Sequence, residues 1–221
     1  MIEYNEEKAL ELVGLFEITE IPIEETETGF YHHNGWFGYV DAYVLQGIVR
    51  MFKPKLIIEA GCGWSSILID ETTDAEHWCI DPHPRRDISS LTHVIEKPVQ
   101  EMDPTFFDRL DANDILFIDT SHVWTEGGEL PYFFNVIFPR LKKDVIVHFH
   151  DIFLPWPYPP QWITDGYNEQ YMVEKLLDES DMFEIIFPAH LMARHRPDEL
   201  TAKFGLRPDQ VYSGSMWLKK C

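Results

Sequence analysis

The feature that most constrains the fold is a regular alternation between short apolar runs and helix-like segments along most of the chain. The apolar runs, such as LIIEA (56–60) and DVIVHFH (144–150), are nearly continuous. Strands with this pattern are buried on both faces, which is typical of a parallel sheet covered by helices. The expected strands cover residues 56–60, 77–81, 92–96, 114–119, 144–150, 183–187 and 213–220.

The segments between these runs have the periodicity of helices. In residues 38–52, for example, Val40, Val44 and Ile48 fall on one helical face, and Pro54 disfavours helix just beyond. Further helices are expected in residues 5–16, 64–71, 105–111, 129–141 and 168–180. The expected fold class is therefore α/β, a Rossmann-like, doubly wound, mostly parallel seven-stranded sheet with helices on both faces.

The composition is that of a globular protein. Hydrophobic residues make up 45% of the 221, and no internal repeat or flexible linker is evident. We expect an N-terminal helix and arm in residues 1–37, followed by one domain in residues 38–221. The net charge of −20 argues against nucleic acid as a partner, because binding a phosphate backbone needs a basic surface.

Cysteine usage and the N-terminus favour a soluble protein of the cytoplasm. The three cysteines, Cys62, Cys79 and Cys221, are odd in number and show no CxxC spacing, which fits a reduced compartment. The first 16 residues are acidic where a signal peptide would be basic. No apolar run approaches the roughly 20 residues that span a bilayer, so no membrane partner is expected.

Polar residues and glycines recur where the predicted strands end. In open α/β sheets ligands bind beyond the carboxyl ends of the strands, so these residues should meet in one cleft. They are Glu59, Gly61 and Gly63 after the first strand, Asp81 after the second, Asp119 and His122 after the fourth, and His150 and Asp151 after the fifth.

The glycine turn EAGCGWSS (59–66) follows a strand and opens a helix, which suits the close approach of a ligand to the backbone. Asp81 comes 22 residues after Glu59, where an acid can accept hydrogen bonds from ribose hydroxyls. A nicotinamide fingerprint would require glycine where Ser66 stands. The E-x-G-x-G pattern instead looks like the first motif of enzymes that use S-adenosyl-L-methionine.

Several stretches together resemble class I S-adenosylmethionine-dependent methyltransferases. The resemblance is to the bacterial group that includes macrolide sugar O-methyltransferases and cephalosporin-hydroxylase-like proteins. It runs in family order from about residue 38 to the C-terminus. The matching stretches are FKPKLIIEAGCGWSS, CIDPHP, DILFIDTSHVWTEGGEL, FPRLKKDVIVHFHDIFLPWPYP, YNEQYMVEKLL and SGSMWLKK.

The resemblance implies a role for each matching position. The residues expected to bind the cofactor are Glu59, Gly61, Gly63, Ser65, Asp81, Gln100 and Asp119. In metal-dependent members, an acid on the fourth strand and two consecutive residues after the fifth hold a divalent cation. Those positions match Asp119, His150 and Asp151, with His150 standing where some members have a second carboxylate.

The chemistry of these side chains suits transfer of a methyl group to oxygen. The acceptor hydroxyl must lose a proton, and His122 or His150 could be the base. A cation such as Mg²⁺, Mn²⁺ or Fe²⁺ would lower the pKa of a bound hydroxyl. If His148 or His122 joins the cluster, it also resembles a two-histidine, one-carboxylate oxygenase site, although His148 fits a core histidine better.

Three outer segments carry weaker signals. The proline- and tryptophan-rich LPWPYPPQW (154–162) predicts a rigid wall over the acceptor site or a pinned surface loop. GFYHHNGWFGYV (29–40) could close over the cofactor, with His32 and His33 exposed. Residues 190–210 favour a solvated helical insertion. Three arginines there, Arg194, Arg196 and Arg207, leave an anionic acceptor or a neighbouring subunit as the alternative.

The leading hypothesis is therefore an S-adenosylmethionine-dependent methyltransferase acting on a hydroxyl of a small molecule or sugar, with a divalent metal as a further expectation. A metal-dependent hydrolase or oxygenase on the same fold is the first alternative. A non-catalytic cofactor-binding protein is the second. The sequence leaves the acceptor open and is compatible with a homo-oligomer.

Overall fold

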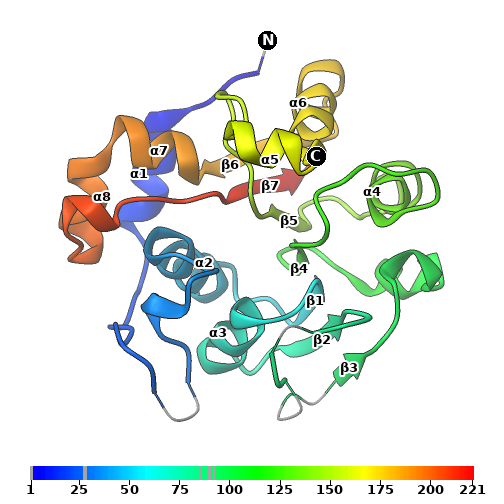
Figure 1. The fold of residues 1–221 in the computed structure, drawn as a ribbon, viewed down its shortest axis with the longest axis horizontal. Coiled ribbons are helices and arrows are strands. Elements are labelled where there is room, and N and C mark those ends of the chain that lie inside the picture. Colours follow the sequence, from blue (N-terminus) through cyan, green and yellow to red (C-terminus); the bar gives the residue numbers. More distant parts are fainter. Residues whose placement is uncertain (1, 27–28, 85, 89–90, 92) are drawn as a thin grey trace.

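The computed structural model describes residues 2–26, 29–84, 86–88, 91 and 93–221. Within them lies one seven-stranded sheet with the order β3-β2-β1-β4-β5-β7-β6 (Figure 1). All neighbouring strands pair in parallel except β7, which runs antiparallel to both β5 and β6. The strands are β1 (Leu56–Ala60), β2 (Glu76–Ile80), β3 (His93–Ile95), β4 (Ile115–Ile118), β5 (Ile146–Phe149), β6 (Phe183–Pro188) and β7 (Met216–Lys220).

Helices cover both faces of this sheet, which confirms the doubly wound prediction. Alternate residues of a strand point to opposite faces. Ile57 accordingly belongs to the buried cluster that contains residues of α2, α3 and α7, whereas Ile58 belongs to the cluster that contains residues of η3, η4 and α6. The α-helices are α1 (Glu6–Gly14), α2 (Tyr39–Phe52), α3 (Trp64–Thr72), α4 (Glu129–Tyr132), α5 (Pro160–Thr164), α6 (Glu169–Glu179), α7 (Ala189–His195) and α8 (Pro197–Phe204). The shorter turns are η1 (His32–Asn34), η2 (Val99–Glu101), η3 (Pro104–Arg109), η4 (Phe133–Ile137) and η5 (Pro208–Gln210).

Two predicted helices differ in type from the expectation. The segment predicted over 105–111 is the 3₁₀-helix η3, which begins at Pro104 after an Asp103 cap. The helix predicted over 129–141 starts as α4 and continues as the π-helical turn η4. Phe138 donates to the carbonyl of Phe133 at 2.8 Å, five residues back, just before Pro139 breaks the ladder. Residue 92 of the predicted third strand lies outside the described residues.

The N-terminal segment packs directly on the sheet-covering helices. Ala9 and Val13 of α1 belong to the same buried cluster as α2, α7 and α8. The ring of Phe16 lies over Gly47, where an added Cβ would come within 2.3 Å of the Phe16 Cγ. Arg196 holds Glu6 of α1 at 2.9 Å through its Nε.

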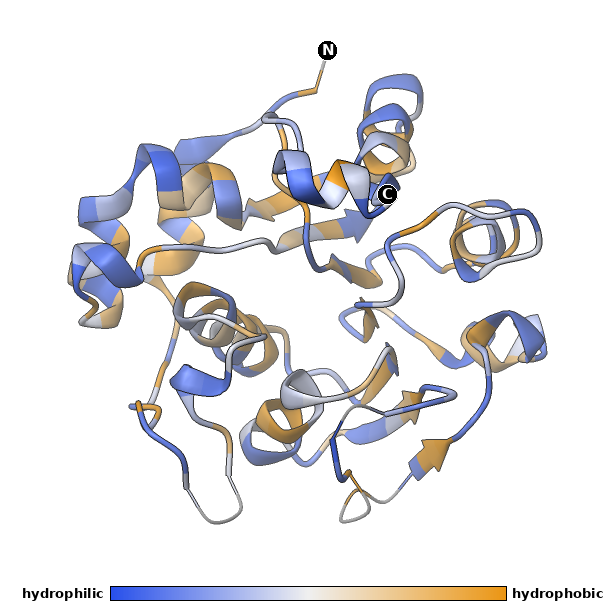
Figure 2. Ribbon diagram, in the orientation of Figure 1, coloured by the Kyte–Doolittle hydropathy of each residue, from blue (hydrophilic) through white to orange (hydrophobic). Residues whose placement is uncertain are grey.

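Hydropathy follows this arrangement. The central strands are largely hydrophobic, and the outward surfaces of the peripheral helices are hydrophilic (Figure 2). The prediction of a solvated insertion over 190–210 is wrong for α7, because Leu191 and Met192 are buried in the core beside α2. In the part of the chain that the structure describes, no helix is both long enough and apolar enough to cross a bilayer.

Candidate active site

A cavity of about 1080 Å³ opens at the carboxyl ends of β1, β2, β4 and β5. Parallel strands deliver their carboxyl ends to one edge of the sheet, so residues far apart in the sequence line one space. The predicted site residues that line it are Gly61, Gly63, Ser65, Asp81, Gln100, Asp119, His122, His150 and Asp151.

The glycine turn packs against β4 at Gly61 and leaves room for a ligand at Gly63. Gly61 has φ +80°, and a Cβ there would lie 1.7 Å from the carbonyl oxygen of Asp119, so only glycine fits this close approach of β1 to β4. A Cβ at Gly63, by contrast, would meet nothing within 4 Å. The turn is therefore held against the neighbouring strand end while its Gly63 side stays open to the cavity.

Asp81 fixes the shape of this turn as well as lining the cavity. Its Oδ2 accepts from the Cys62 amide at 2.9 Å, and its Oδ1 accepts from the His83 amide at 2.7 Å. An ionised carboxylate has about four acceptor positions, so two remain for a ligand.

Glu59 does not line the cavity but lies beneath the turn. It is fully buried, with Oε1 accepting from the Ser65 hydroxyl at 2.5 Å and Oε2 3.0 Å from the His77 Nε2. The resemblance implied that Glu59 binds the cofactor, directly or through water; with both oxygens engaged beneath the turn, a direct contact is not available, and a role in cofactor binding stays a prediction. Its oxygens instead serve the residues that support the turn.

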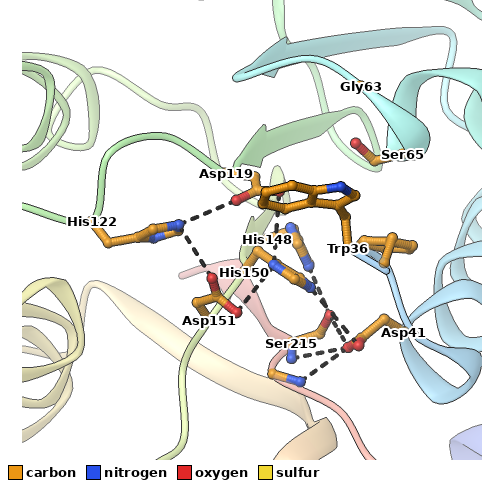
Figure 3. Close-up of polar contacts among 12 residues, drawn as sticks. Trp36, Asp41, Gly63, Ser65, Asp119, His122, His148, His150, Asp151 and Ser215 are labelled. Carbon is orange, nitrogen blue, oxygen red and sulfur yellow. Dashed lines mark hydrogen bonds and ion pairs between the residues drawn. The ribbon is translucent and has the colours of Figure 1, made fainter. Parts of the chain in front are cut away.

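At the other end of the cavity His122 points toward Asp119 and Asp151 (Figure 3), and Glu169 lies on the other side of its ring. Its Nδ1 is 2.7 Å from a Glu169 oxygen, and its Nε2 is 3.3 Å from both Asp119 and Asp151. Burial disfavours the imidazolium, but hydrogen bonds with Asp119 and Glu169 outweigh it and raise the pKa of His122 well above its ordinary value. His122 has φ 61° and Asp151 has φ 58°, a left-handed conformation that non-glycine residues adopt rarely and often at functional sites.

His150 lies deeper, between these carboxylates and Asp41 (Figure 3). Its Nδ1 is 3.4 Å from Asp151 and 3.7 Å from Asp119, and its Nε2 is 3.8 Å from Asp41. Its ring stacks on Phe37 with centroids 5.1 Å apart. Burial again works against the charge, but the surrounding carboxylates raise the pKa of His150 to about 10.

Asp41 and Glu169 were not identified as site residues from the sequence. Asp41 is buried and accepts from the hydroxyls of Ser213 and Ser215 at 2.5 and 2.6 Å. Both acids stand in the first turn of a helix, where acids are common for electrostatic reasons alone. One sequence signal could have identified Asp41 as a site residue, namely its position beside the apolar face of the helix predicted over residues 38–52.

The donor set at this end of the cavity fits a divalent cation. The ligand atoms of Asp119, His122 and Asp151 all lie within 4.8 Å of one another. Carboxylate oxygens with one imidazole suit hard or borderline ions. The cluster therefore contains His122, whereas the expected metal ligand His150 approaches the same two carboxylates from below.

His148 takes no part in this cluster. It is fully buried, its Nε2 is 3.0 Å from the Ser215 hydroxyl, and its ring stacks on Phe117 at 3.8 Å. Burial lowers the pKa of His148 well below its ordinary value, so the ring is neutral. His148 is a core histidine, as expected. It is therefore not available as a metal ligand for the two-histidine, one-carboxylate oxygenase site considered above.

Aromatic residues from the two predicted outer loops and from the segment before α6 line the cavity. Trp36 and Trp162 line it, and Tyr167 packs against His122 with centroids 4.9 Å apart. Tyr158 is buried behind Trp162. The segment 154–162 thus contributes a wall and is also pinned to the domain.

The expectation that His32 is exposed is wrong. His32 is 5% exposed and stacks on Tyr39 at 4.2 Å, because the arm folds back onto the start of α2. His33 does lie at the surface, where its Nδ1 is 3.0 Å from Glu24.

The three arginines of residues 190–210 do not line the cavity. Arg194 lies over the Trp156 ring, Arg196 pairs with Glu6 of α1, and Arg207 pairs with Asp209. Each arginine therefore contacts a residue of its own chain away from the cavity. These contacts do not support the alternative in which the arginines bind an anionic acceptor.

Comparison with known proteins agrees with this geometry. The family described as "Methyltransferase domain" matches residues 58–152. An uncharacterized protein of Archaeoglobus fulgidus is 31% identical over 133 residues, which are 52% of this chain. The chain spans 60% of the length of that relative.

Solved structures share the fold at low sequence identity. A methyltransferase of Podospora anserina, bound to S-adenosylhomocysteine, has a TM-score of 0.51 and 19% identity, and the match covers 81% of this chain and 77% of that one. The O-methyltransferase TomG of Streptomyces achromogenes, in complex with S-adenosylmethionine, has a TM-score of 0.53 and 12% identity, with 100% and 92% covered. The chain therefore shares the fold of these solved methyltransferases, and its residues 58–152 match the methyltransferase domain family.

Proposed function

We propose that this protein transfers a methyl group from S-adenosylmethionine to an oxygen of a small-molecule acceptor. The observation that carries the proposal is the single cavity that joins the glycine turn and Asp81 at one end to His122 and its carboxylates at the other. A cofactor that supplies the methyl group leaves the protein two tasks, orienting the reactants and removing a proton.

The cofactor is proposed to lie along the ends of β1 and β2. The open side of Gly63 would admit its methionine part, and the free acceptor positions of Asp81 would receive the ribose hydroxyls. Val99 and Gln100 line the cavity beyond Asp81, where the adenine would sit. In this pose the sulfonium faces Asp119.

The acceptor is proposed to bind against His122. Hydrogen bonds with Asp119 and Glu169 favour the protonated ring, so His122 would act as a base where the cofactor sulfonium or a bound cation offsets the Asp119 charge. In its neutral form His122 donates its Nδ1–H to Glu169 and presents the Nε2 lone pair to the cavity. As the acceptor oxygen forms its bond to the methyl carbon, the carbon–sulfur bond breaks and Nε2 takes the hydroxyl proton. His150 is less suited, since its ring is stacked on Phe37 and its Nε2 points toward Asp41.

Asp119 and Asp151 are proposed to hold a divalent cation such as Mg²⁺, together with one of the two imidazoles. Such an ion would lower the pKa of a bound hydroxyl. An imidazole nitrogen that ligates a metal cannot also take a proton, so the other histidine is the base. If His122 is the base, His122→Asn removes turnover and keeps metal binding, whereas His150→Asn weakens metal binding and lowers turnover only as far as loss of the metal does.

Calorimetry with S-adenosylhomocysteine tests the proposed cofactor site. We expect binding to the wild type and at least a tenfold weaker affinity for Asp81→Ala, a loss of about 1.4 kcal/mol. Asp209→Ala, which removes a surface carboxylate paired with Arg207, is the matched control. No binding to the wild type at hundreds of micromolar, or equal binding by Asp81→Ala, would remove the proposal.

A further inference from the structure

A second cluster of potential metal ligands lies beneath the glycine turn, separate from the cavity carboxylates. In the parallel pairing of β1 with β2, Glu59 is opposite Cys79. His77 precedes Cys79 by two residues and so lies on the same face of the sheet. Glu59 and Cys79 are fully buried, and His77 is 8% exposed. The ligand atoms of the three side chains therefore meet in a buried space beneath the turn.

The distances between these atoms match the coordination shell of a zinc ion. His77 Nε2 is 3.0 Å from Glu59 Oε2, Cys79 Sγ is 3.5 Å from His77 Nε2, and Cys79 Sγ is 3.6 Å from Glu59 Oε2. A triangle with these sides has a centre about 2 Å from each corner, close to ordinary Zn–N, Zn–O and Zn–S bond lengths of about 2.0–2.3 Å.

Hydrogen bonds alone satisfy this triangle incompletely. Without a metal, His77 Nε2 and Cys79 Sγ offer at most two protons for three contacts, and the Cys79 thiol donates its proton to Glu59. The third contact, between Cys79 Sγ and His77 Nε2, then has no proton of its own and can only share one with the contacts to Glu59. A central cation satisfies all three atoms at once, and its two charges balance the Glu59 carboxylate and a Cys79 thiolate in a buried space.

We propose that Glu59, His77 and Cys79 bind a structural Zn²⁺ ion. A mixed set of thiolate, imidazole and carboxylate ligands is typical of zinc. Cys62 packs with Cys79 in a small buried cluster, and its Sγ would have to turn from the Glu59 carbonyl, 3.9 Å away, to supply a fourth ligand. The Ser65 hydroxyl, which donates to the other Glu59 oxygen, orients the carboxylate as an outer-shell partner.

The position of this ion would couple it to the architecture of the glycine turn. It would tie β1 to β2 directly below the Gly61–Gly63 turn and two residues before Asp81. The ion would stabilise the fold rather than take part in methyl transfer. Its presence is therefore independent of the function proposed for the cavity.

Cobalt(II) provides the test, because a thiolate ligand gives Co²⁺ a near-ultraviolet charge-transfer band that oxygen and nitrogen ligands do not give. The full-length chain is refolded with Co²⁺, and unbound metal is removed by gel filtration. We expect about one tightly held cobalt with a thiolate band in the wild type. Cys221→Ser, at an exposed cysteine, and Asp151→Asn, in the cavity cluster, should keep the band, whereas Cys79→Ser and His77→Ala should lose it.

The absence of a thiolate band in the folded wild type overturns the proposal, whatever the variants do. So does a band that persists in Cys79→Ser at wild-type intensity. Because the buried variants could fail to fold, far-ultraviolet circular dichroism accompanies each spectrum. If the buried variants do not fold, the presence or absence of the thiolate band in the wild type decides whether the proposal stands. Neither readout requires cofactor or acceptor, so failure here is distinct from failure of the proposed function.

Discussion

His122 Nδ1 lies 2.7 Å from a carboxylate oxygen of Glu169, which is 47 residues further along the chain and fully buried. The backbone joins the same two segments, since the His122 carbonyl accepts from the amides of Asn168 and Glu169 at 2.9 and 3.2 Å. The start of α6 therefore fixes both the ring and the backbone of the proposed base. Burial raises the pKa of Glu169, and the His122 imidazole opposes that rise.

Replacing Glu169 with glutamine should lower kcat for methyl transfer by about 10- to 100-fold, because an outer-shell partner no longer holds the imidazole in its orientation. The KM for S-adenosylmethionine should change little, since Glu169 does not line the cavity. Steady-state kinetics measures both. Glu174→Gln, at an exposed position of the same helix, is the control. A Glu169→Gln enzyme with wild-type kcat would show that Glu169 is only a core residue.

Two glycine substitutions should separate folding from cofactor binding. Gly61→Ala places a Cβ 1.7 Å from the Asp119 carbonyl and is expected to destabilise the fold markedly. Gly63→Ala meets no protein atom within 4 Å, so its Tm should match the wild type while S-adenosylhomocysteine binding weakens. Thermal unfolding and calorimetry give the two readouts. Unchanged binding by Gly63→Ala would mean that the cofactor does not approach this side of the turn.

Removal of divalent metal should reduce turnover if Asp119 and Asp151 share a cation. Dialysis against a chelator is expected to lower kcat, and added Mg²⁺ or Mn²⁺ should restore it in the wild type but not in Asp151→Asn. Mg²⁺ prefers oxygen ligands, so its addition does not refill a thiolate site. Turnover that is insensitive to chelation would favour catalysis by the histidines alone.

The contact between Phe16 and Gly47 predicts a strong energetic coupling between the N-terminal segment and α2. Phe16→Ala empties a buried position and should cost about 3–5 kcal/mol of unfolding free energy. Gly47→Ala forces a Cβ into the Phe16 ring and should cost about 1–3 kcal/mol. In the double variant the added methyl group occupies space left by the ring. The loss of unfolding free energy in the double variant should therefore be smaller than the sum of the two single losses. Additive losses by urea unfolding would contradict this packing.

His32 should make stability fall as the pH is lowered. Burial lowers the pKa of His32 to about 4, below its value of about 6.5 in the unfolded chain. Between these values the unfolded chain binds a proton that the folded chain does not, so unfolding becomes easier toward acid. The loss from this residue is about 2 kcal/mol between pH 6.5 and 5.

Comparison of His32→Phe with wild type isolates that contribution. Urea unfolding at pH 6.5 and pH 5 should show a smaller loss in His32→Phe. His33→Phe, at the neighbouring exposed position, should behave like the wild type. An identical pH dependence in all three proteins would place the responsible titration elsewhere.

The sheet and the location of the site could be predicted from the sequence because both follow from local pattern. Runs such as LIIEA pair in parallel, and parallel strands bring Asp81, Asp119 and Asp151 to one edge. The partners of the histidines could not be predicted in this way. Asp41 and Glu169 reach the site from helices, and only tertiary packing distinguishes them from ordinary first-turn acids.

The same limit applies to residues whose environment depends on long-range packing. The burial of His32 results from the arm folding onto α2. The burial of Met192 results from the packing of α7 beside α2. Glu59 matched its motif, but the contacts of its two oxygens with His77 and Ser65 appear only in the folded structure. The chemical roles of the cavity residues remain predictions.

A crystal structure with S-adenosylhomocysteine tests the central claim most directly. The account predicts ribose hydroxyls within hydrogen-bonding distance of Asp81 and a thioether sulfur facing the space between Asp119 and His122. Density for the nucleoside at any other surface, or its ribose turned away from Asp81, would contradict it.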